Sequence, residues 1–181
     1  MNRIEKIRSK FEDYEIDALL LVSPVNRRYA SGFHSSDGVA LITKDGAYLF
    51  VDSRYFEAAE KTAAGFTVEL VDNRNSYKLR ISEALEKHGC SCVGFEEAYM
   101  SCAEYGKYSG EIIKVPMKPA SKLINELRRT KDRSEIDNLI AAQRIAERAF
   151  DEALGIIRPG MTEREVAAEL VYRMLRNGAE N

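Results

Sequence analysis

The hydrophobic pattern of the chain changes at two prolines, Pro116 and Pro119, and this change constrains the fold more than any other feature. Before them, short apolar segments with strand-like and helix-like spacing alternate, and eight of the 11 glycines lie in the first 110 residues. After them, apolar residues recur only at helical spacing. Because proline continues neither a helix interior nor a strand ladder, we interpret residues 115–120 as a linker. We therefore predict two domains, 1–119 and 120–181.

The first region has the pattern of a mixed α/β domain. Residues 18–22 form a short continuous apolar run, which is typical of a strand buried on both faces. Residues 39–43 and 47–51 are two further strand candidates, and Asp45 and Gly46 between them favour a hairpin turn. This order predicts an α/β fold with a mixed β-sheet flanked by helices. The other expected elements are helices around 4–11, from a cap at Ser53 to near Gly65, from a cap at Ser76 to His88 and over 99–108, and strands at 66–71 and 91–95.

The second region predicts two amphipathic helices and no strand. We expect Ser134 to be the N-cap of the first helix, with Asp137 in the capping-box position. Thr162 and Glu165 form a full capping box for the second helix, which ends near Gly178. Two such helices bury only one apolar stripe each and need a partner surface. We interpret them as the start of a larger, incomplete domain.

Composition excludes several classes of protein. The chain has 45% hydrophobic residues and a net charge of −2, which favours a packed core and excludes an extended surface for nucleic acid. No apolar run approaches the roughly 20 residues that span a bilayer, and residues 1–10 are not an apolar signal segment. We interpret Arg27 and Arg28 as solvated loop charges. The expectation is a soluble, cytoplasmic protein with no nucleic-acid or membrane partner.

The three cysteines, Cys90, Cys92 and Cys102, cannot all pair within one chain. In a protein expected in the cytoplasm, reduced thiols are the normal state. A zinc site with His88 lacks a fourth ligand at suitable spacing. We therefore predict buried, inert thiols, since free cysteine behaves as a small hydrophobic residue.

Two sets of short motifs follow one another along the chain. The first set comprises residues 17–26, Tyr29, 31–33, 36–38, 40–43, 45–46 and 49–55, and the second comprises residues 127–132, 135–136, Ala142, 145–146 and 159–163. The first set resembles the N-terminal domain of the creatinase/prolidase group of metallopeptidases, which includes Xaa-Pro dipeptidase and aminopeptidase P. The second set resembles the start of that group's catalytic "pita-bread" domain, so the resemblance covers essentially the whole chain.

The resemblance also implies what these 181 residues lack. Family members hold two divalent metal ions, manganese or cobalt, with two Asp, one His and two Glu that follow the second predicted helix. The two histidines here, His34 and His88, both precede the prolines, and no carboxylate cluster has metal-ligand spacing. We interpret Glu163, Glu165 and Glu169 as capping and solvated residues. We therefore expect no cofactor, metal ligand or catalytic residue in this chain, and no peptidase activity of its own.

Loop 32–38, from Gly32 to Gly38, is the best candidate for a binding site. It places His34, two serines and Asp37 between two glycines before a strand, where polar side chains reach ligands. The alternative is that Ser36 and Asp37 close an Asx-type turn and that His34 ends a strand. No Gly-x-Ser-x-Gly elbow supports a serine hydrolase.

The resemblance gives this loop a role in a homodimer. In related dimeric enzymes the corresponding loop leans over the partner subunit's active site and helps to hold the substrate's amino terminus. Asp37 would then pair with the free α-ammonium of a small Xaa-Pro peptide. His34 would be a gate or a hydrogen-bond donor to the substrate.

Three hypotheses for function follow. The first is the N-terminal part of a metal-dependent Xaa-Pro dipeptidase (prolidase) or aminopeptidase P, a hydrolase, in which this part supports dimerisation and shapes the substrate pocket. The second is a stand-alone binding or assembly domain. The third is the N-terminal part of a creatinase-like hydrolase without peptidase activity, since the groups that separate these chemistries would lie beyond Asn181.

Overall fold

The structure is a computed structural model that describes residues 2–180, and it divides into two compact units. The first unit extends to Arg129 and the second starts at Thr130. Within the described residues, no helix combines the length and the apolar character needed to cross a membrane.

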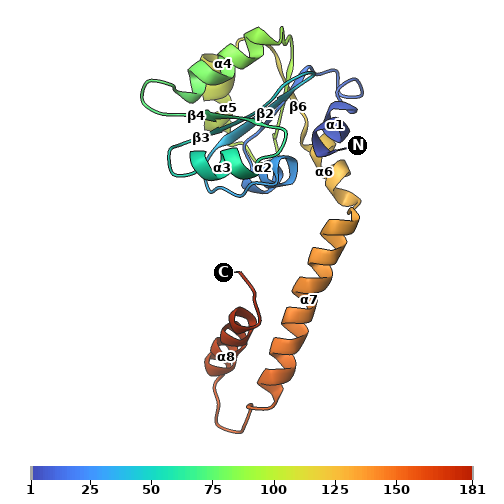
Figure 1. Ribbon diagram of the computed structural model, residues 1–181, viewed down its shortest axis with the longest axis vertical. Helices are drawn as coiled ribbons and strands as arrows, with labels where there is room; N and C mark the ends of the chain where they lie inside the picture. Colours follow the sequence, from blue (N-terminus) through green and yellow to red (C-terminus); the bar gives the residue numbers. More distant parts are fainter. Residues whose placement is uncertain (1, 181) are drawn as a thin grey trace. The chain divides into compact units, whose positions relative to one another are not determined.

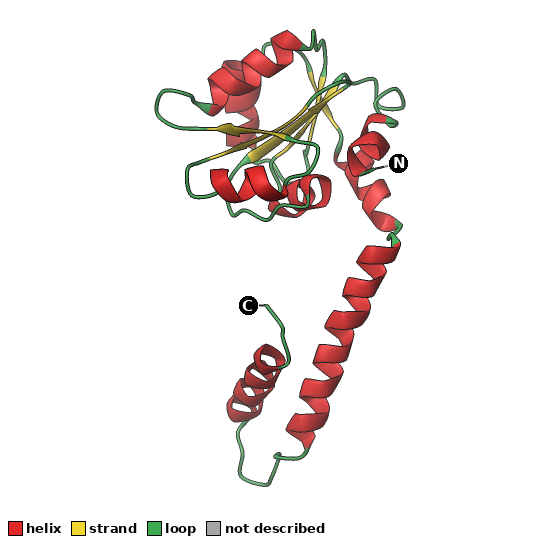
Figure 2. Ribbon diagram, in the orientation of Figure 1, coloured by secondary structure: helices red, strands yellow, loops and turns green. Residues whose placement is uncertain are grey.

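A six-stranded sheet forms the centre of the first unit, with the strand order β4-β3-β2-β1-β5-β6 (Figures 1 and 2). Strand β2 is antiparallel to both of its neighbours, β1 and β3. The pairs β1 with β5, β5 with β6 and β3 with β4 are parallel. Every strand except β2 therefore points the same way. The strands are β1 (Ala18–Leu21), β2 (Val39–Thr43), β3 (Ala47–Val51), β4 (Thr67–Leu70), β5 (Val93–Phe95) and β6 (Met117–Pro119).

Alternate residues of each strand point to opposite faces of the sheet. Both faces carry apolar side chains, and helices cover both of them. In β1, Leu19 and Leu21 pack into a core with α1, α2, α3 and α6, whereas Ala18 and Leu20 pack with α4 and the π-helix η1. The central strands β1, β2 and β3 are buried throughout. The helical elements are α1 (Arg3–Arg8), α2 (Pro24–Ser31), α3 (Phe56–Thr62), α4 (Tyr77–Lys87), α5 (Cys102–Lys107), η1 (Tyr108–Ile112) and α6 (Ser121–Arg129).

The predicted mixed α/β fold is confirmed, and so are its first five strands and the hairpin between β2 and β3. Ser76 accepts a hydrogen bond from the backbone N–H of Leu79 and caps α4, as expected. Gly89 follows this helix with φ +57°, a left-handed conformation that glycine adopts without a Cβ penalty.

The linker predicted at residues 115–120 is wrong, because Met117–Pro119 forms strand β6. This strand lies at the edge of the sheet and pairs only with β5, and an edge position tolerates proline. Helix α6 follows immediately and buries Leu123 and Ile124 against the sheet. The compact units therefore meet between Arg129 and Thr130, whereas we predicted a domain boundary between Pro119 and Ala120.

Three local predictions also need correction. The sequence pattern did not predict α2, which begins at Pro24, a favoured residue for the first helical turn. Ser53 does not cap α3, because this helix begins at Phe56 and the carbonyl of Asp52 accepts the N–H of Phe56. In the second unit, Asp132 rather than Ser134 is the N-cap.

The second unit consists of helices α7 (Arg133–Leu154) and α8 (Glu163–Arg176), which pack against each other. The predicted capping box of Thr162 and Glu165 is confirmed at the start of α8. Within the described part of this unit, only Ala149 and Ala153 are fully buried. Many of its larger apolar side chains remain exposed, namely Ile136, Leu139, Ile140, Phe150, Leu154, Ile157, Val171, Tyr172 and Leu175.

Candidate functional site

One edge of the sheet collects the residues of the candidate site. The strands β1, β3 and β5 end at this edge, and β2 starts there because it runs in the opposite direction. We call it the carboxyl edge. Open α/β sheets bind ligands outside the carboxyl ends of their strands. Loop 32–38, which connects α2 to β2, lies at the carboxyl edge.

The two predicted site residues, His34 and Asp37, are both exposed on this loop. The Asp37 side chain is 60% exposed, and its Oδ1 accepts the N–H of Gly38 at 2.7 Å. Its Oδ2 lies 3.9 Å from Nη2 of Arg54, which is a long ion pair. Among the described residues, the His34 side chain makes no hydrogen bond and the structure does not join it to Asp37. Because its side chain is mostly exposed and its ion pair with Arg54 is long, the carboxylate of Asp37 stays open to a further cation.

The neighbouring hydroxyl does not close the same turn. Ser36 Oγ lies 2.7 Å from the hydroxyl oxygen of Tyr55, which follows β3. The bond from the N–H of Gly38 to Asp37 is local, whereas the contact between Ser36 and Tyr55 attaches the loop to another segment of the carboxyl edge.

Asp52 and Arg54 form a tight local ion pair beside the loop. Nη2 of Arg54 lies 2.6 Å from Oδ2 of Asp52, and Nε bonds both carboxylate oxygens. This bonding lowers the pKa of Asp52 and raises that of Arg54. The guanidinium also lies over the Tyr55 ring at 5.2 Å. Because Arg54 is already paired with Asp52, its charge is only partly available to Asp37.

The prediction that Arg27 is a solvated loop charge is wrong. Arg27 belongs to α2 and is buried, with 3% exposure. Its Nη1 donates to the carbonyls of Val22 and Gly38, both at 2.6 Å. Its Nη2 donates to the carbonyl of Ser35 at 2.9 Å. Burial lowers the pKa of Arg27, while the negative charges of Asp37 and Glu96 oppose that shift.

Glu96 is a second buried charge that the sequence did not reveal, and it is 1% exposed. It follows β5 directly, and its carboxylate accepts the N–H groups of Val22 at 2.5 Å and Ser23 at 2.8 Å. It also accepts Nδ2 of Asn26 at 2.5 Å, while Oδ1 of Asn26 accepts Nη1 of Arg128. A carboxylate at a helix N-terminus satisfies unpaired N–H groups and complements the helix dipole. Glu96 thus attaches the start of α2 to the end of β5.

Two tyrosines lie within the electrostatic reach of Asp37. Burial raises the pKa of Tyr77, and the charge of Asp37 adds to the shift. Burial likewise raises the pKa of Tyr108 to about 12, with additions from Glu104 and Asp37. Both hydroxyls are therefore protonated at neutral pH and are hydrogen-bond donors. Within residues 2–180, the buried hydroxyl of Tyr77 has no hydrogen-bond partner.

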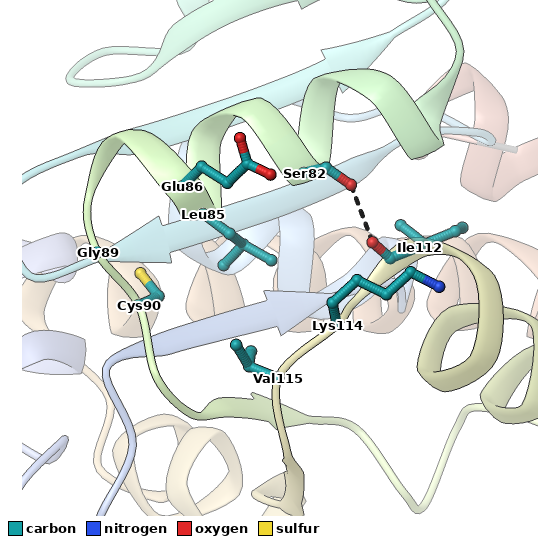
Figure 3. A pocket seen from close by; sticks show the side chains of 8 residues that line it. All are labelled: Ser82, Leu85, Glu86, Gly89, Cys90, Ile112, Lys114 and Val115. Carbon is teal, nitrogen blue, oxygen red and sulfur yellow. Dashed lines mark hydrogen bonds between the residues drawn. The ribbon is translucent and has the colours of Figure 1, made fainter.

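A separate cavity of about 110 Å³ lies between α4 and the segment that leads into β6 (Figure 3). Ser82 Oγ donates to the carbonyl of Ile112 at 2.9 Å on one side of it. Cys90 precedes β5 and Val115 precedes β6, so this cavity lies at the amino ends of the strands. It is therefore at the opposite edge from loop 32–38.

The cysteines follow the sequence prediction only in part. All three are free, and Cys90 is buried, with a pKa that burial raises to about 11. Its thiol is thus neutral and unreactive at pH 7. Cys92 is half-buried and Cys102 is exposed, so the prediction of buried thiols is wrong for Cys102. Cys102 begins helix α5, whose described residues are all exposed.

The acidic residues of α8 make local contacts. Glu165 closes the capping box with Thr162, and Glu169 lies 3.3 Å from Arg173. Across residues 2–180, no three His, Cys, Asp or Glu side chains form a group that could hold a metal ion. The described residues therefore do not fit a dinuclear metal site.

The fold corresponds to a known domain type. Residues 3–130 match the model of the creatinase/prolidase N-terminal domain, and residues 137–181 match metallopeptidase family M24. The chain therefore belongs to the family of creatinase/prolidase N-terminal domains, continued by the beginning of a domain of the M24 metallopeptidases.

Known proteins with similar sequences or structures match this chain over nearly its whole length. An uncharacterized peptidase of Bacillus subtilis, YqhT, is 34% identical over 99% of this chain. The Xaa-Pro dipeptidase from Bacillus anthracis superposes with a TM-score of 0.92 at 35% identity over 99% of this chain. The X-Pro aminopeptidase from Thermotoga maritima superposes with a TM-score of 0.86 at 30% identity over 100% of this chain. The chain spans 50%, 50% and 51% of these proteins, respectively, and it matches the N-terminal half of Xaa-Pro dipeptidases and aminopeptidases P.

Proposed function

We propose that this chain is the N-terminal part of a metal-dependent, cytoplasmic Xaa-Pro dipeptidase or aminopeptidase P that acts on small peptides as a homodimer. The superposition on the Xaa-Pro dipeptidase from Bacillus anthracis along 99% of the chain carries this proposal. The M24 match from residue 137 onward supports a metallopeptidase as the parent enzyme. The three free cysteines fit a reducing compartment.

In this proposal, two manganese or cobalt ions are bound by residues beyond Asn181. When bound, such a metal pair supplies an activated water for attack on the Xaa-Pro bond. The described residues supply no ligand set for it. In this proposal, the 181-residue chain is inactive by itself.

Loop 32–38 contributes to the substrate pocket of the partner subunit. Asp37 is 60% exposed and its nearest cation, Arg54, is already paired with Asp52. A carboxylate in that state pairs well with the free α-ammonium that dipeptides present. His34, exposed on the same loop, donates a hydrogen bond to the substrate or gates its entry.

The activity test compares the 181-residue chain with a chain that continues past Asn181 to the length of its relatives. Both are assayed on Xaa-Pro dipeptides and longer Xaa-Pro peptides with added Mn²⁺ or Co²⁺. We expect hydrolysis by the longer chain alone. Activity of the short chain would show that the chemistry lies within these residues.

The same assay separates the two alternatives. Turnover of creatine without turnover of Xaa-Pro peptides would indicate a creatinase-like hydrolase. A stop codon after Asn181 in the gene, with a folded and inactive product, would indicate a stand-alone binding or assembly domain. Sedimentation of the longer chain tests the homodimer.

The role of Asp37 has a matched control in Asp13, whose side chain is 58% exposed and which forms an ion pair with Lys10. In the full-length enzyme, Asp37→Asn should raise KM for free dipeptides about tenfold, since one charge-assisted contact is lost. Asp13→Asn should leave KM unchanged. Equal kinetics for Asp37→Asn and the wild type would remove Asp37 from the site.

A further inference from the structure

We infer that Arg27 is a positioning residue, which holds loop 32–38 so that Asp37 presents its carboxylate to the substrate's amino group. This inference rests on the proposed function of Asp37 but concerns a different residue, one that no substrate atom can reach. Arg27 is 3% exposed and lies on α2, whose start Glu96 attaches to the end of β5. Its own position is therefore set by the sheet.

The guanidinium of Arg27 connects the end of one strand to both sides of the loop. Nη1 bonds the carbonyl of Val22, just after β1, and the carbonyl of Gly38, just before β2. Nη2 bonds the carbonyl of Ser35. A planar group with donors in fixed directions can hold three carbonyls at once, which a single ammonium cannot do with the same geometry.

These contacts restrict Asp37 in particular. The carbonyls of Ser35 and Gly38 lie two residues before and one residue after Asp37, so the backbone is held on both sides of it. Gly38 has φ +127°, and a Cβ there would meet the carbonyl oxygen of Phe50 at 2.9 Å. The end of the loop is thus packed against β3. At Ser36, the contact of its hydroxyl with that of Tyr55 adds a further attachment, so the remaining freedom between Ser35 and Gly38 lies mainly in the side chain of Asp37.

An electrostatic attraction between Arg27 and Asp37 acts together with these hydrogen bonds. Arg27 is a buried cation whose nearby negative charges include Asp37 and Glu96. Glu96 is committed to the N–H groups at the start of α2. The attraction between the buried Arg27 cation and the exposed carboxylate of Asp37 therefore adds to the hydrogen bonds, and salt screens it less than it screens two exposed charges.

The first experiment measures amide hydrogen exchange in the full-length enzyme. We expect Arg27→Met to accelerate exchange at residues 33–38 by about tenfold or more, because it removes the hydrogen bonds that Arg27 donates to the carbonyls of Ser35 and Gly38 in this loop. The control is Arg28→Met, the adjacent arginine, which is exposed. It should leave the loop unchanged. Unchanged exchange in Arg27→Met would overturn the inference.

The second experiment is a double-mutant cycle on Xaa-Pro dipeptides. Arg27→Met should raise KM about tenfold through displacement of Asp37, and it should have little further effect in an Asp37→Asn background. N-acetylated dipeptides, which lack the ammonium group, should show no additional loss. Fully additive effects of the two substitutions would show that Arg27 does not act through Asp37.

Arg27→Lys covers the case in which Arg27→Met does not fold. It keeps the charge, but its three donors share one nitrogen and cannot reproduce the geometry of the guanidinium, so we expect an intermediate rise in loop exchange and in KM. A lysine variant identical to the wild type in both would overturn the inference. If the wild-type enzyme does not hydrolyse Xaa-Pro peptides, the proposed function fails, and accelerated loop exchange in the Arg27 variants still establishes that Arg27 holds the loop.

Discussion

Both units contain amphipathic helices, but the apolar stripe of α6 in the first unit is buried, whereas much of that of α7 in the second unit is exposed. In the first unit, α6 buries Leu123 and Ile124 against the sheet. In the second unit, α7 has equally regular apolar spacing, yet Leu139 is 58% exposed. An amphipathic helix gains most of its stability from the surface that covers its apolar stripe. The comparison shows that periodicity predicts which face of a helix is available for packing, whereas the neighbouring elements decide whether that face is buried.

Separating the two units should produce the largest difference. Residues 1–129, expressed alone, should fold and unfold cooperatively, because they contain both cores of the sheet. Residues 130–181 alone should have low helicity and no sharp transition, since two helices with exposed stripes are marginal in water. Circular dichroism during heating measures both. A sharp, concentration-independent melt of residues 130–181 would contradict the comparison.

Single truncations of apolar side chains should show the same contrast on a smaller scale. Phe50→Ala removes a fully buried ring from β3 and should lower the free energy of unfolding by about 3–5 kcal/mol. Leu139→Ala in the 181-residue chain should change it by less than about 0.5 kcal/mol. Urea denaturation measures both values.

The Leu139→Ala substitution has a second test in the full-length enzyme. There, Leu139→Ala should cost about 2 kcal/mol or more if further segments cover α7. An effect as small as in the 181-residue chain would indicate that this face of α7 stays exposed.

Asp17 tests an electrostatic contact that belongs to the first unit alone. Hydrogen bonds from Lys44 and Ser91 lower its pKa. Asp17→Asn should lower the free energy of unfolding at pH 7 by about 1–2 kcal/mol, a value reduced because Lys44 is exposed. The ionised form is favoured in the folded state, so this contribution is present above the unfolded pKa of about 4 and is lost as pH falls through the lower folded pKa.

Denaturation at pH 7 and pH 3 measures this loss. The difference between the wild type and Asp17→Asn should shrink at pH 3. Asp13→Asn, whose ion pair with Lys10 is exposed, should show no such pH dependence. A constant difference for Asp17→Asn would show that packing rather than charge is responsible.

The smallest expected effect concerns a helix cap in the second unit. Thr162 Oγ1 accepts the N–H of Glu165 at 3.3 Å, and its own hydroxyl donates to the Glu165 carboxylate at 2.9 Å. Thr162→Ala should destabilise the first turn of α8 by about 0.5–1 kcal/mol. Amide exchange at residues 163–166 should rise, while the unfolding of the first unit stays the same. A shift in that unfolding would show that the units are energetically coupled.

Most elements of the fold were predictable because their signals are local. The apolar run of β1, the hairpin turn at Gly46 and the capping box at Thr162 each depend on a few adjacent residues. Strand β6 was missed because Pro116, which precedes it, and Pro119, its last residue, suggested a linker. Its status as a strand depends on pairing with β5, which lies more than 20 residues earlier in the chain.

The candidate site was predictable to a similar extent. Its exposed residues, His34 and Asp37, were identified from a polar loop between glycines. The residues that support the loop, Arg27 and Glu96, were missed because charged side chains are usually solvated. The one available signal was Glu96 directly after a buried strand, where a carboxylate meets the start of a neighbouring helix.

By itself, the sequence determined the first five strands, most of the helices, the polar loop and the apolar stripes of the helices in the second unit, because turn chemistry and side-chain periodicity act over a few residues. Only the tertiary structure decided that Pro119 ends an edge strand, that Arg27 and Glu96 are buried, and that Leu123 is covered while Leu139 is not. Burial depends on groups brought together from distant parts of the chain. A buried charge is stable only when such groups provide hydrogen bonds and opposite charge around it.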